Sequence, residues 1–256
     1  MQMLSSAPPS ASTASALGRL LENLRLTPDE LSILRELGWE LRTARRRQPL
    51  VVEGAKLRLV YLVLDGFLIR YRILRDGQRQ IVNVTIPGDF AGVPSCFFAD
   101  SLYTVRALTD ATVAALPLDR LVALFETHPR IPAKIFWSFS CESAIYAERL
   151  VVVSRRPALE RIAHFLLELL TRLQRAGLAD ERSFKMPLRQ HVIGDALGLS
   201  LAYVNRVLRQ LADDGLVFIR GDRIIINNVD ALSSLADFEH GYLRPMSMTE
   251  FSEATV

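Results

Sequence analysis

The sequence predicts an α+β protein with a β-rich first half, one long helix and a mainly helical second half. Three observations support this fold class. Short apolar segments separated by turns fill residues 50–117, the stretch after Pro132 continues to Val153 without glycine or proline, and two short helical patterns meet at Gly198. We therefore expect a roll of strands, a long helix and a compact helical unit, in that order.

Composition limits the class of protein. At 256 residues the chain can form two modest domains, and its share of 50% hydrophobic and 23% charged residues is typical of globular proteins. The formal net charge of +3 is unevenly distributed, since residues 155–228 contain twelve Lys or Arg and eight Asp or Glu, whereas residues 229–256 contain one and five. The positive excess in one segment favours a nucleic-acid partner for that segment.

The sequence indicates a cytoplasmic protein. Charges such as Lys134 and Glu142 interrupt the one long apolar stretch, and the start of the chain lacks the pattern of a signal peptide. Residues 1–16 are rich in Ser, Ala and Pro and are expected to form a disordered tail. Two cysteines, Cys96 and Cys141, make no disulfide framework and are interpreted as small apolar residues.

The first half begins with two helices and continues as strands. Residues 17–38 contain two helical segments, of which the second has Thr27 as its cap and Pro28 at its first position. Between Leu50 and Pro117, Asp65-Gly66 and Asp76-Gly77 each separate alternating apolar runs, which predicts two hairpins. Several hairpins in succession predict a compact roll or barrel.

The long helix is expected to form a dimer. Between Pro132 and Val153, six residues recur at spacings of three and four, as in a coiled-coil seam: Phe136, Phe139, Ser143, Tyr146, Leu150 and Val153. A second face with Trp137, Cys141 and Ala144 is expected to pack on the roll of the same chain. The predicted domains are a tail (1–16), the roll with its N-terminal helices (17–130), the dimer helix (131–154), the helical unit (155–238) and a second tail (239–256).

The stretch from Leu188 to Leu216 predicts a helix-turn-helix. A first helix runs from about Arg189 to Leu197, Gly198 permits the left-handed turn that ends it, and Ser200 caps the next helix. That second helix is expected to bury Val204, Val207, Leu208 and Leu211. Two β-branched runs around Arg220-Gly221-Asp222-Arg223 then predict a basic hairpin, which makes the motif a winged helix-turn-helix.

A helix of this kind enters the major groove of DNA with the residues of its first turns. Arg206 can donate two hydrogen bonds to guanine, and the amide of Asn205 suits adenine. The predicted base contacts are Leu201, Ala202, Asn205 and Arg206. The predicted contacts with the DNA backbone are Arg189, Gln190, Ser200, Tyr203, Arg209, Arg220 and Arg223.

From Ala158 to Ile226 the chain resembles the DNA-binding domain of the Crp/Fnr superfamily, with the triplet Val204-Asn205-Arg206 in its second helix. YLVLDGFLIRYRILRDGQRQIVNVTIPGDF is similar to the cyclic-nucleotide-binding β-roll of the same superfamily, and the resemblance extends from about Leu50 to Leu235. It implies a homodimeric transcription regulator without catalytic residues, which binds a near-palindromic DNA operator under the control of a small-molecule effector. RNA polymerase is a further implied partner.

The resemblance also shows two departures. The implied effector pocket comprises Gly88, Asp89, Phe90, Val93 and Ser101. Members that bind cyclic nucleotides have a glutamate where this chain has Val93, and an Arg-Ser pair where it has Ser101-Leu102. Cyclic AMP is therefore disfavoured, and the pocket either takes another ligand or is filled by Phe97 and Phe98. In the second helix of the helix-turn-helix, members of the superfamily usually have a glutamate where this chain has Ala202. An alanine can contact a thymine methyl group but accepts no hydrogen bond from cytosine.

No metal or iron–sulfur cluster is expected, because no cysteine precedes Leu50. The roll contains no histidine, which leaves heme without an obvious ligand and disfavours a metal-dependent cupin enzyme. Of the four histidines, His128 is assigned to a loop, His164 to a helix surface, His191 to a possible phosphate contact and His240 to the tail. A second alternative is a ligand-binding or protein-interaction module whose winged helix does not touch DNA.

Overall fold

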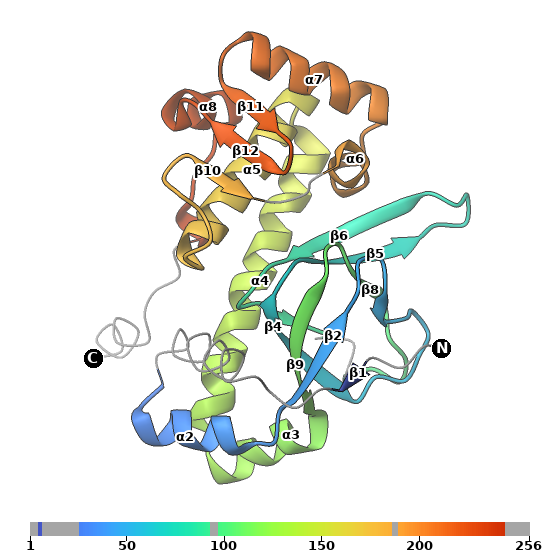
Figure 1. The fold of residues 1–256 in the computed structure, drawn as a ribbon, viewed down its shortest axis with the longest axis vertical. Helices are drawn as coiled ribbons and strands as arrows, with labels where there is room; N and C mark the ends of the chain where they lie inside the picture. The colour runs from blue at the N-terminus through green and yellow to red at the C-terminus, as the bar shows by residue number, and fades with distance from the viewer. Residues whose placement is uncertain (1–4, 7–25, 93–96, 186–188, 244–256) are drawn as a thin grey trace. The chain divides into compact units, whose positions relative to one another are not determined.

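The computed structural model describes residues 5–6, 26–92, 97–185 and 189–243, except for the side chains of Ser5, Ser6 and Trp137 (Figure 1). The chain divides into two compact units, residues 1–138 and 139–256. The first contains β1 (Ser5–Ser6), α2 (Pro28–Glu36), β2 (Glu40–Ala44), β3 (Pro49–Val51), β4 (Leu59–Asp65), β5 (Leu68–Ile73), β6 (Arg79–Thr85), β7 (Phe90–Ala91), β8 (Thr104–Ala107), β9 (Ala111–Pro117) and α3 (Leu118–Thr127). Helix α4 (Arg130–Arg155) continues into the second unit, which contains α5 (Ala158–Arg175), β10 (Ser183–Lys185), α6 (Gln190–Leu197), α7 (Leu201–Asp213), β11 (Val217–Arg220), β12 (Arg223–Ile226), α8 (Val229–Ala236) and the 3-10 helix η2 (Gly241–Leu243). The predicted α+β class is confirmed.

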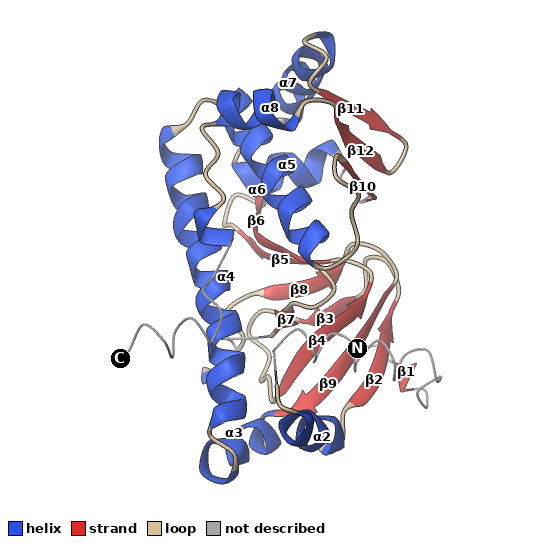
Figure 2. Cartoon of the chain, turned by 90° about the vertical axis from the view of Figure 1, so that its left-hand side faces the viewer, coloured by secondary structure: helices blue, strands red, loops and turns tan. Residues whose placement is uncertain are grey.

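The first unit is a roll of two antiparallel sheets (Figure 2). One sheet has the order β1-β2-β9-β4-β7 and the other the order β3-β8-β5-β6. Strand β4 is buried along most of its length, with Val60 and Val63 fully enclosed. Because β4 and β9 pair over Leu59–Asp65, the apolar run that the sequence shows at this point forms the centre of the first sheet.

One of the two predicted hairpins is wrong. Asp76-Gly77 joins β5 to β6, which pair along their whole length, as predicted. Asp65-Gly66 instead leads the chain from β4 in one sheet to β5 in the other. Gly66 has φ +78°, and a Cβ there would lie 2.3 Å from the carbonyl oxygen of Asp110. The glycine therefore allows a close approach to a distant turn, which the local sequence does not reveal.

The roll also starts earlier than predicted. Strand β2 pairs with β9 across five residues, ten residues before the expected start at Leu50. Two residues of the expected disordered tail, Ser5 and Ser6, form β1 and pair with Thr43 and Arg42. Backbone pairing at the free edge of β2 requires no apolar side chain, so composition gives no sign of it. The first predicted helix, at residues 17–25, and the rest of the tail lie outside the described residues.

Helix α2 confirms the cap that the sequence predicts. The Thr27 side chain accepts a hydrogen bond from the amide of Glu30, whose carboxylate accepts one from the amide of Thr27. The same Glu30 carboxylate accepts a 2.9 Å hydrogen bond from the Lys134 ammonium and lies 3.2 Å from Arg130. Burial would raise the pKa of Glu30, but these interactions hold it below its ordinary value. The ion pairs attach α2 to the first turns of α4.

The buried face of α4 differs from the one expected. Cys141 and Ala144 are only half-buried, and the side chain of Trp137 lies outside the described part. The buried side chains among the described residues of the helix are instead Ile131, Pro132, Lys134, Ile135, Ile145, Arg149 and Val152. An arginine on this face interrupts the apolar pattern that the prediction followed, and its partner is described below.

The second unit is organised around α5, which is buried on almost every side. A three-stranded sheet of order β10-β12-β11 and the helices α6, α7 and α8 belong to the same unit. The predicted loose tail after His240 is wrong for residues 241–243. Leu243 is buried, its carbonyl oxygen accepts a hydrogen bond from Arg175, and Tyr242 lies against His164. Residues 244–256 lie outside the described ranges.

Candidate nucleic-acid interface

The turn between α6 and α7 follows the predicted chemistry. Gly198 ends α6 in the left-handed conformation, with φ 65° and ψ 38°. Ser200 then caps α7, and its hydroxyl accepts a hydrogen bond from the amide of Tyr203 at 3.3 Å. The two helices are therefore joined by a short, hydrogen-bonded turn, as in a helix-turn-helix.

A second glycine that sequence reasoning missed holds the two helices close together. The amide of Leu199 donates to the carbonyl of Gly194 at 3.0 Å. A Cβ on Gly194 would lie 2.6 Å from the carbonyl oxygen of Leu199, which is shorter than any real contact. The glycine within the helical pattern of α6 is the only sign of this close approach in the sequence.

Helix α7 has one buried and one exposed face. Val204, Val207 and Leu211 are buried, while Leu208 is half-buried. The predicted readers Leu201, Ala202 and Arg206 are exposed, and Asn205 is half-buried. The polar face of α7 is therefore not packed into its own unit.

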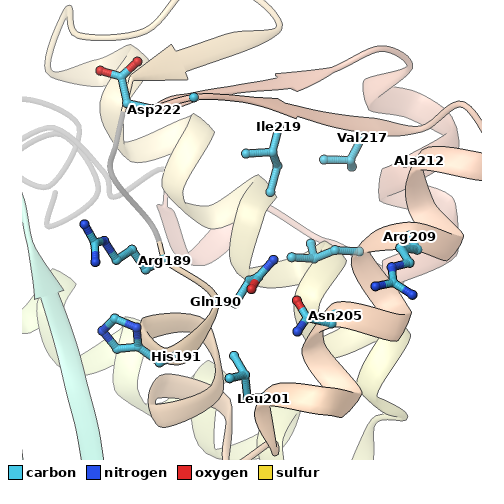
Figure 3. A pocket seen from close by; sticks show the side chains of 12 residues that line it. Arg189, Gln190, His191, Leu201, Asn205, Arg209, Ala212, Val217, Ile219 and Asp222 are labelled. Carbon is cyan, nitrogen blue, oxygen red and sulfur yellow. The ribbon is translucent and has the colours of Figure 1, made fainter.

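The hairpin β11–β12 lies beside α7 and forms a wing. Together α6, α7 and the wing line a hollow of about 990 Å³ (Figure 3). Arg189 and Gln190 approach it from the start of α6, Asn205 and Arg209 from α7, and Ile219 and Asp222 from the wing. A second hollow of about 770 Å³ is lined by α7 alone and the residue after it, including Ala202, Arg206 and Arg209. Seven of the predicted DNA contacts thus line these two hollows: Arg189, Gln190, Leu201, Ala202, Asn205, Arg206 and Arg209.

The two arginines at the tip of the wing differ in their surroundings. Arg220 is exposed at the end of β11. Arg223 donates hydrogen bonds to the Asp180 carboxylate at 3.0 Å and to the Ser183 hydroxyl at 2.7 Å. The Ser183 hydroxyl in turn donates to the Asp180 carboxylate at 2.9 Å, and this bond, followed by the one from Arg223, holds the pKa of the Asp180 carboxyl below its ordinary value. The bonds from Arg223 also connect β12 to the loop before β10, a strand that sequence reasoning did not predict.

A buried ionic cluster joins α4 to α5. The Glu168 carboxylate accepts hydrogen bonds from Arg149 at 2.6 Å and from Arg172 at 3.1 Å, and all three side chains are buried. Burial would raise the pKa of Glu168, but the charges of both arginines outweigh it and lower the pKa. Sequence reasoning missed the cluster, because a charge in a helix is usually exposed.

His164 is buried beside this cluster, which corrects its assignment to the helix surface. Its ring makes an edge contact with Phe238 at 4.9 Å between centroids and stacks on Tyr242 at 6.1 Å. Its Nε2 lies 3.4 Å from Glu148. The pKa of His164 is lowered to about 4, mainly by burial; the charge of Glu168 opposes the shift, and the charges of Arg156 and Arg149 contribute to it. The neutral imidazole is therefore the form that the folded chain holds.

We expect the second unit to lose stability as the pH falls from about 6.5 to about 4. The unfolded chain takes up a proton near the ordinary pKa of 6.5, whereas folded His164 resists protonation until about pH 4. Stability should therefore decline between these two values, by about 3 kcal/mol from this residue. Urea unfolding at a series of pH values measures this loss of stability. The control is His164→Phe, which keeps an aromatic ring at this position and cannot titrate. A decline of equal size in both proteins would contradict the expectation.

The effector region of the roll is partly described. Phe90 is buried, Gly88 and Asp89 are half-buried, and Val93 and Cys96 lie outside the described residues. Ser101 is buried, and its hydroxyl donates to the carbonyl of Tyr103 at 2.9 Å. Phe97 and Phe98 do not fill the roll, because 57% and 48% of their surfaces are exposed.

The interior of the roll contains polar side chains that sequence reasoning missed. Arg70 on β5 is opposite Asn83 on β6, and Leu68 is opposite Thr85, so all four side chains share one face of the sheet. All are buried, Arg70 with 5% exposure. The Arg70 guanidinium lies 5.7 Å from the centre of the Tyr103 ring. In the sequence, Arg70 appears only as an interruption of the apolar run of β5.

Cys141 gives no sign of redox chemistry. The residue is half-buried on α4, and burial raises the pKa of its thiol. A raised pKa lowers the fraction of reactive thiolate. This environment agrees with the interpretation of Cys141 as a small apolar residue.

A β-roll that precedes a winged helix-turn-helix with an exposed second helix defines the class of DNA-binding regulators. Within the described ranges, no helix is both long and apolar enough to span a membrane. A model of the cyclic nucleotide-binding domain matches residues 41–128, and a model of the Crp-like helix-turn-helix domain matches residues 160–235.

Individual relatives agree with these matches. The regulatory protein HlyX of Actinobacillus pleuropneumoniae is 26% identical over 85% of this chain and 90% of its own length. The fumarate and nitrate reduction regulatory protein of Salmonella typhimurium is 25% identical over 86% and 88%. The structure of FixK2 from Bradyrhizobium japonicum matches with a TM-score of 0.70 and 28% identity, over 77% of this chain and 97% of that one. The chain belongs to the Crp/Fnr family of transcription regulators, which are not enzymes.

Proposed function

We propose that this regulator binds a near-palindromic operator as a homodimer, with α7 of each copy in adjacent major grooves. The proposal rests on the exposed face of α7, where Arg206, Leu201 and Ala202 are accessible beside the wing. Two copies related by a twofold axis would place their recognition helices about 34 Å apart, one turn of the duplex. Binding to DNA also assigns the protein to the cytoplasm.

The proposed base contacts are Leu201, Ala202, Asn205 and Arg206. Arg206 would read a guanine, and Leu201 and Ala202 would contact thymine methyl groups. The proposed backbone contacts are Arg189, Gln190, Ser200, Tyr203, Arg209, Arg220 and Arg223. They belong to the start of α6, to α7 with its cap and to the wing, and Arg189, Gln190 and Arg209 line the hollow between these elements.

The proposed dimer interface is the seam of α4. Leu150 and Phe136 support it, because 68% and 67% of their surfaces are exposed within a single chain. Ser143 is exposed as well, while Phe139, Tyr146 and Val153 are half-buried. Large apolar side chains that remain exposed at coiled-coil spacing favour pairing with a second copy.

An effector other than cyclic AMP is proposed to act through the roll, in the region of Gly88, Asp89, Phe90, Val93 and Ser101. The family relationship supports a regulatory role for the roll, and Ser101-Leu102 at the place of an Arg-Ser pair argues against a cyclic phosphate. As in other two-state regulators, the effector would act by binding one arrangement of the dimer more tightly. RNA polymerase is the proposed partner at promoters.

Replacing Arg206 with alanine tests the proposal. We expect Arg206→Ala to weaken binding to a selected operator by about 1–3 kcal/mol and to remove the preference for guanine at one position of each half-site. Arg209→Ala is the matched control, because loss of a phosphate contact should weaken binding to all sequences alike and lower the salt slope by about 1. Selection of bound fragments from genomic DNA, followed by competition binding, measures both effects.

The alternative is a module whose winged helix does not touch DNA. A gel shift on random duplex DNA at several salt concentrations separates the two functions, since contacts with phosphates make affinity fall steeply with salt. Absence of any salt-dependent shift with the full chain would favour the alternative.

A further inference from the structure

The first two turns of α7 align three side chains on one side of the helix. Ser200, Tyr203 and Arg206 are spaced by three residues, and residues at this spacing are neighbours on a helix surface. The Ser200 hydroxyl accepts from the amide of Tyr203 at 3.3 Å, which fixes the backbone from which the tyrosine projects. The guanidinium carbon of Arg206 lies 4.3 Å from the centre of the Tyr203 ring. The cap thus holds the backbone of Tyr203, and the ring of Tyr203 contacts the guanidinium of Arg206.

The Tyr203 ring is the main contact that Arg206 makes within its own chain. In the part of the chain that the structure describes, no hydrogen bond or ion pair involves the Arg206 side chain, although Asp213 and Asp214 line the same hollow. Exposed arginine side chains have many rotamers, and ordering them on binding reduces affinity. A ring that already holds the guanidinium lowers this entropic cost.

The chemistry of the contact leaves Arg206 able to read a base. All N–H donors of a guanidinium lie in its own plane, while contact with an aromatic ring uses its face. A guanidinium that rests on Tyr203 therefore keeps its donors for the O6 and N7 atoms of guanine. The tyrosine is 40% exposed, so its ring remains available at the surface that faces DNA.

We propose that Tyr203 is a positioning residue for base recognition, whose ring orients Arg206 toward guanine. This inference rests on the proposed function and deepens it. It differs from the role of a backbone contact, which depends on the tyrosine hydroxyl and not on the ring.

Two substitutions at this position separate the two roles. Tyr203→Phe keeps the ring and removes the hydroxyl, whereas Tyr203→Leu removes the ring and keeps an apolar side chain of helix-compatible shape. Competition binding compares a selected operator with its three variants at the position where Arg206→Ala loses its preference. We expect Tyr203→Phe to keep the wild-type preference for guanine, and Tyr203→Leu to reduce it by roughly two- to fivefold. In the Arg206→Ala background, Tyr203→Leu should have no further effect on base preference.

Three results would overturn the inference. If Tyr203→Phe and Tyr203→Leu weaken binding to all sequences alike and lower the salt slope, Tyr203 is a phosphate contact only. If Tyr203→Leu keeps the full guanine preference, the ring does not orient Arg206. If Arg206→Ala keeps the full guanine preference, Arg206 reads no base. In each case the wild type still binds DNA in a salt-dependent way, which distinguishes these outcomes from failure of the proposed function.

Discussion

Replacing Glu168 with alanine is expected to destabilise the second unit by about 3–5 kcal/mol. The substitution leaves Arg149 and Arg172 buried without the carboxylate that both of them contact. Two uncompensated positive charges in a water-poor interior cost more than the lost hydrogen bonds alone. Urea unfolding of the full chain, followed by circular dichroism, measures the change.

A triple variant provides the control for this prediction. Arg149→Met, Glu168→Leu and Arg172→Met together remove all three charges and keep similar side-chain volumes. Because apolar residues often replace a buried ionic cluster without loss, this variant should be about as stable as the wild type. If Glu168→Ala costs no more than an ordinary surface substitution, the cluster is not desolvated as the structure describes.

Replacing Leu150 with aspartate should separate the proposed dimer and weaken binding to the proposed palindromic operator by about two orders of magnitude or more. Leu150 lies in the second half of the proposed seam and is 68% exposed in the single chain. A carboxylate there would be buried opposite its own copy, and a monomer can hold only one half-site at a time. Sedimentation gives the mass in solution, and competition binding to a full palindrome and to a single half-site gives the loss of affinity.

Val151→Asp is the matched control for the seam. Val151 is the next residue of α4, is also exposed and apolar, and lies off the predicted seam. The same charge at this position should leave the dimer intact. If the two variants behave alike, or if Leu150→Asp remains a dimer, the seam is not the interface.

Local chemistry made the helix-turn-helix predictable from the sequence. A glycine that ends a helix in the left-handed region and a serine that caps the next one act within a few residues, so Gly198 and Ser200 could be assigned from their neighbours alone. The same holds for the capping box of Thr27 and Glu30. The exposed face of α7 followed from the spacing of its apolar residues.

Features that depend on distant partners could not be predicted in this way. Asp65-Gly66 has the composition of a hairpin turn, but β4 pairs with β9 and β7, so the chain must cross to the other sheet. Glu168 is buried because two arginines from α4 and α5 meet it, and helical periodicity does not distinguish such a residue from an exposed one. Tyr242 is held by the ring of Phe238, four residues before it, and by the ring of His164, which is far from it in the sequence.

In the proposed DNA complex, the ion pair at the wing would make its two tip arginines unequal ligands for a duplex. A phosphate that approaches Arg220 meets an exposed cation, whereas one that approaches Arg223 must displace Asp180, which carries the same negative charge as the phosphate. The exchange of one anion for another at Arg223 releases little free energy, because an exposed ion pair is lost as a phosphate contact is gained. Affinity gained through the wing should therefore come mainly from β11, and Asp180 would act as a built-in competitor that weakens the hold of the hairpin on any duplex alike.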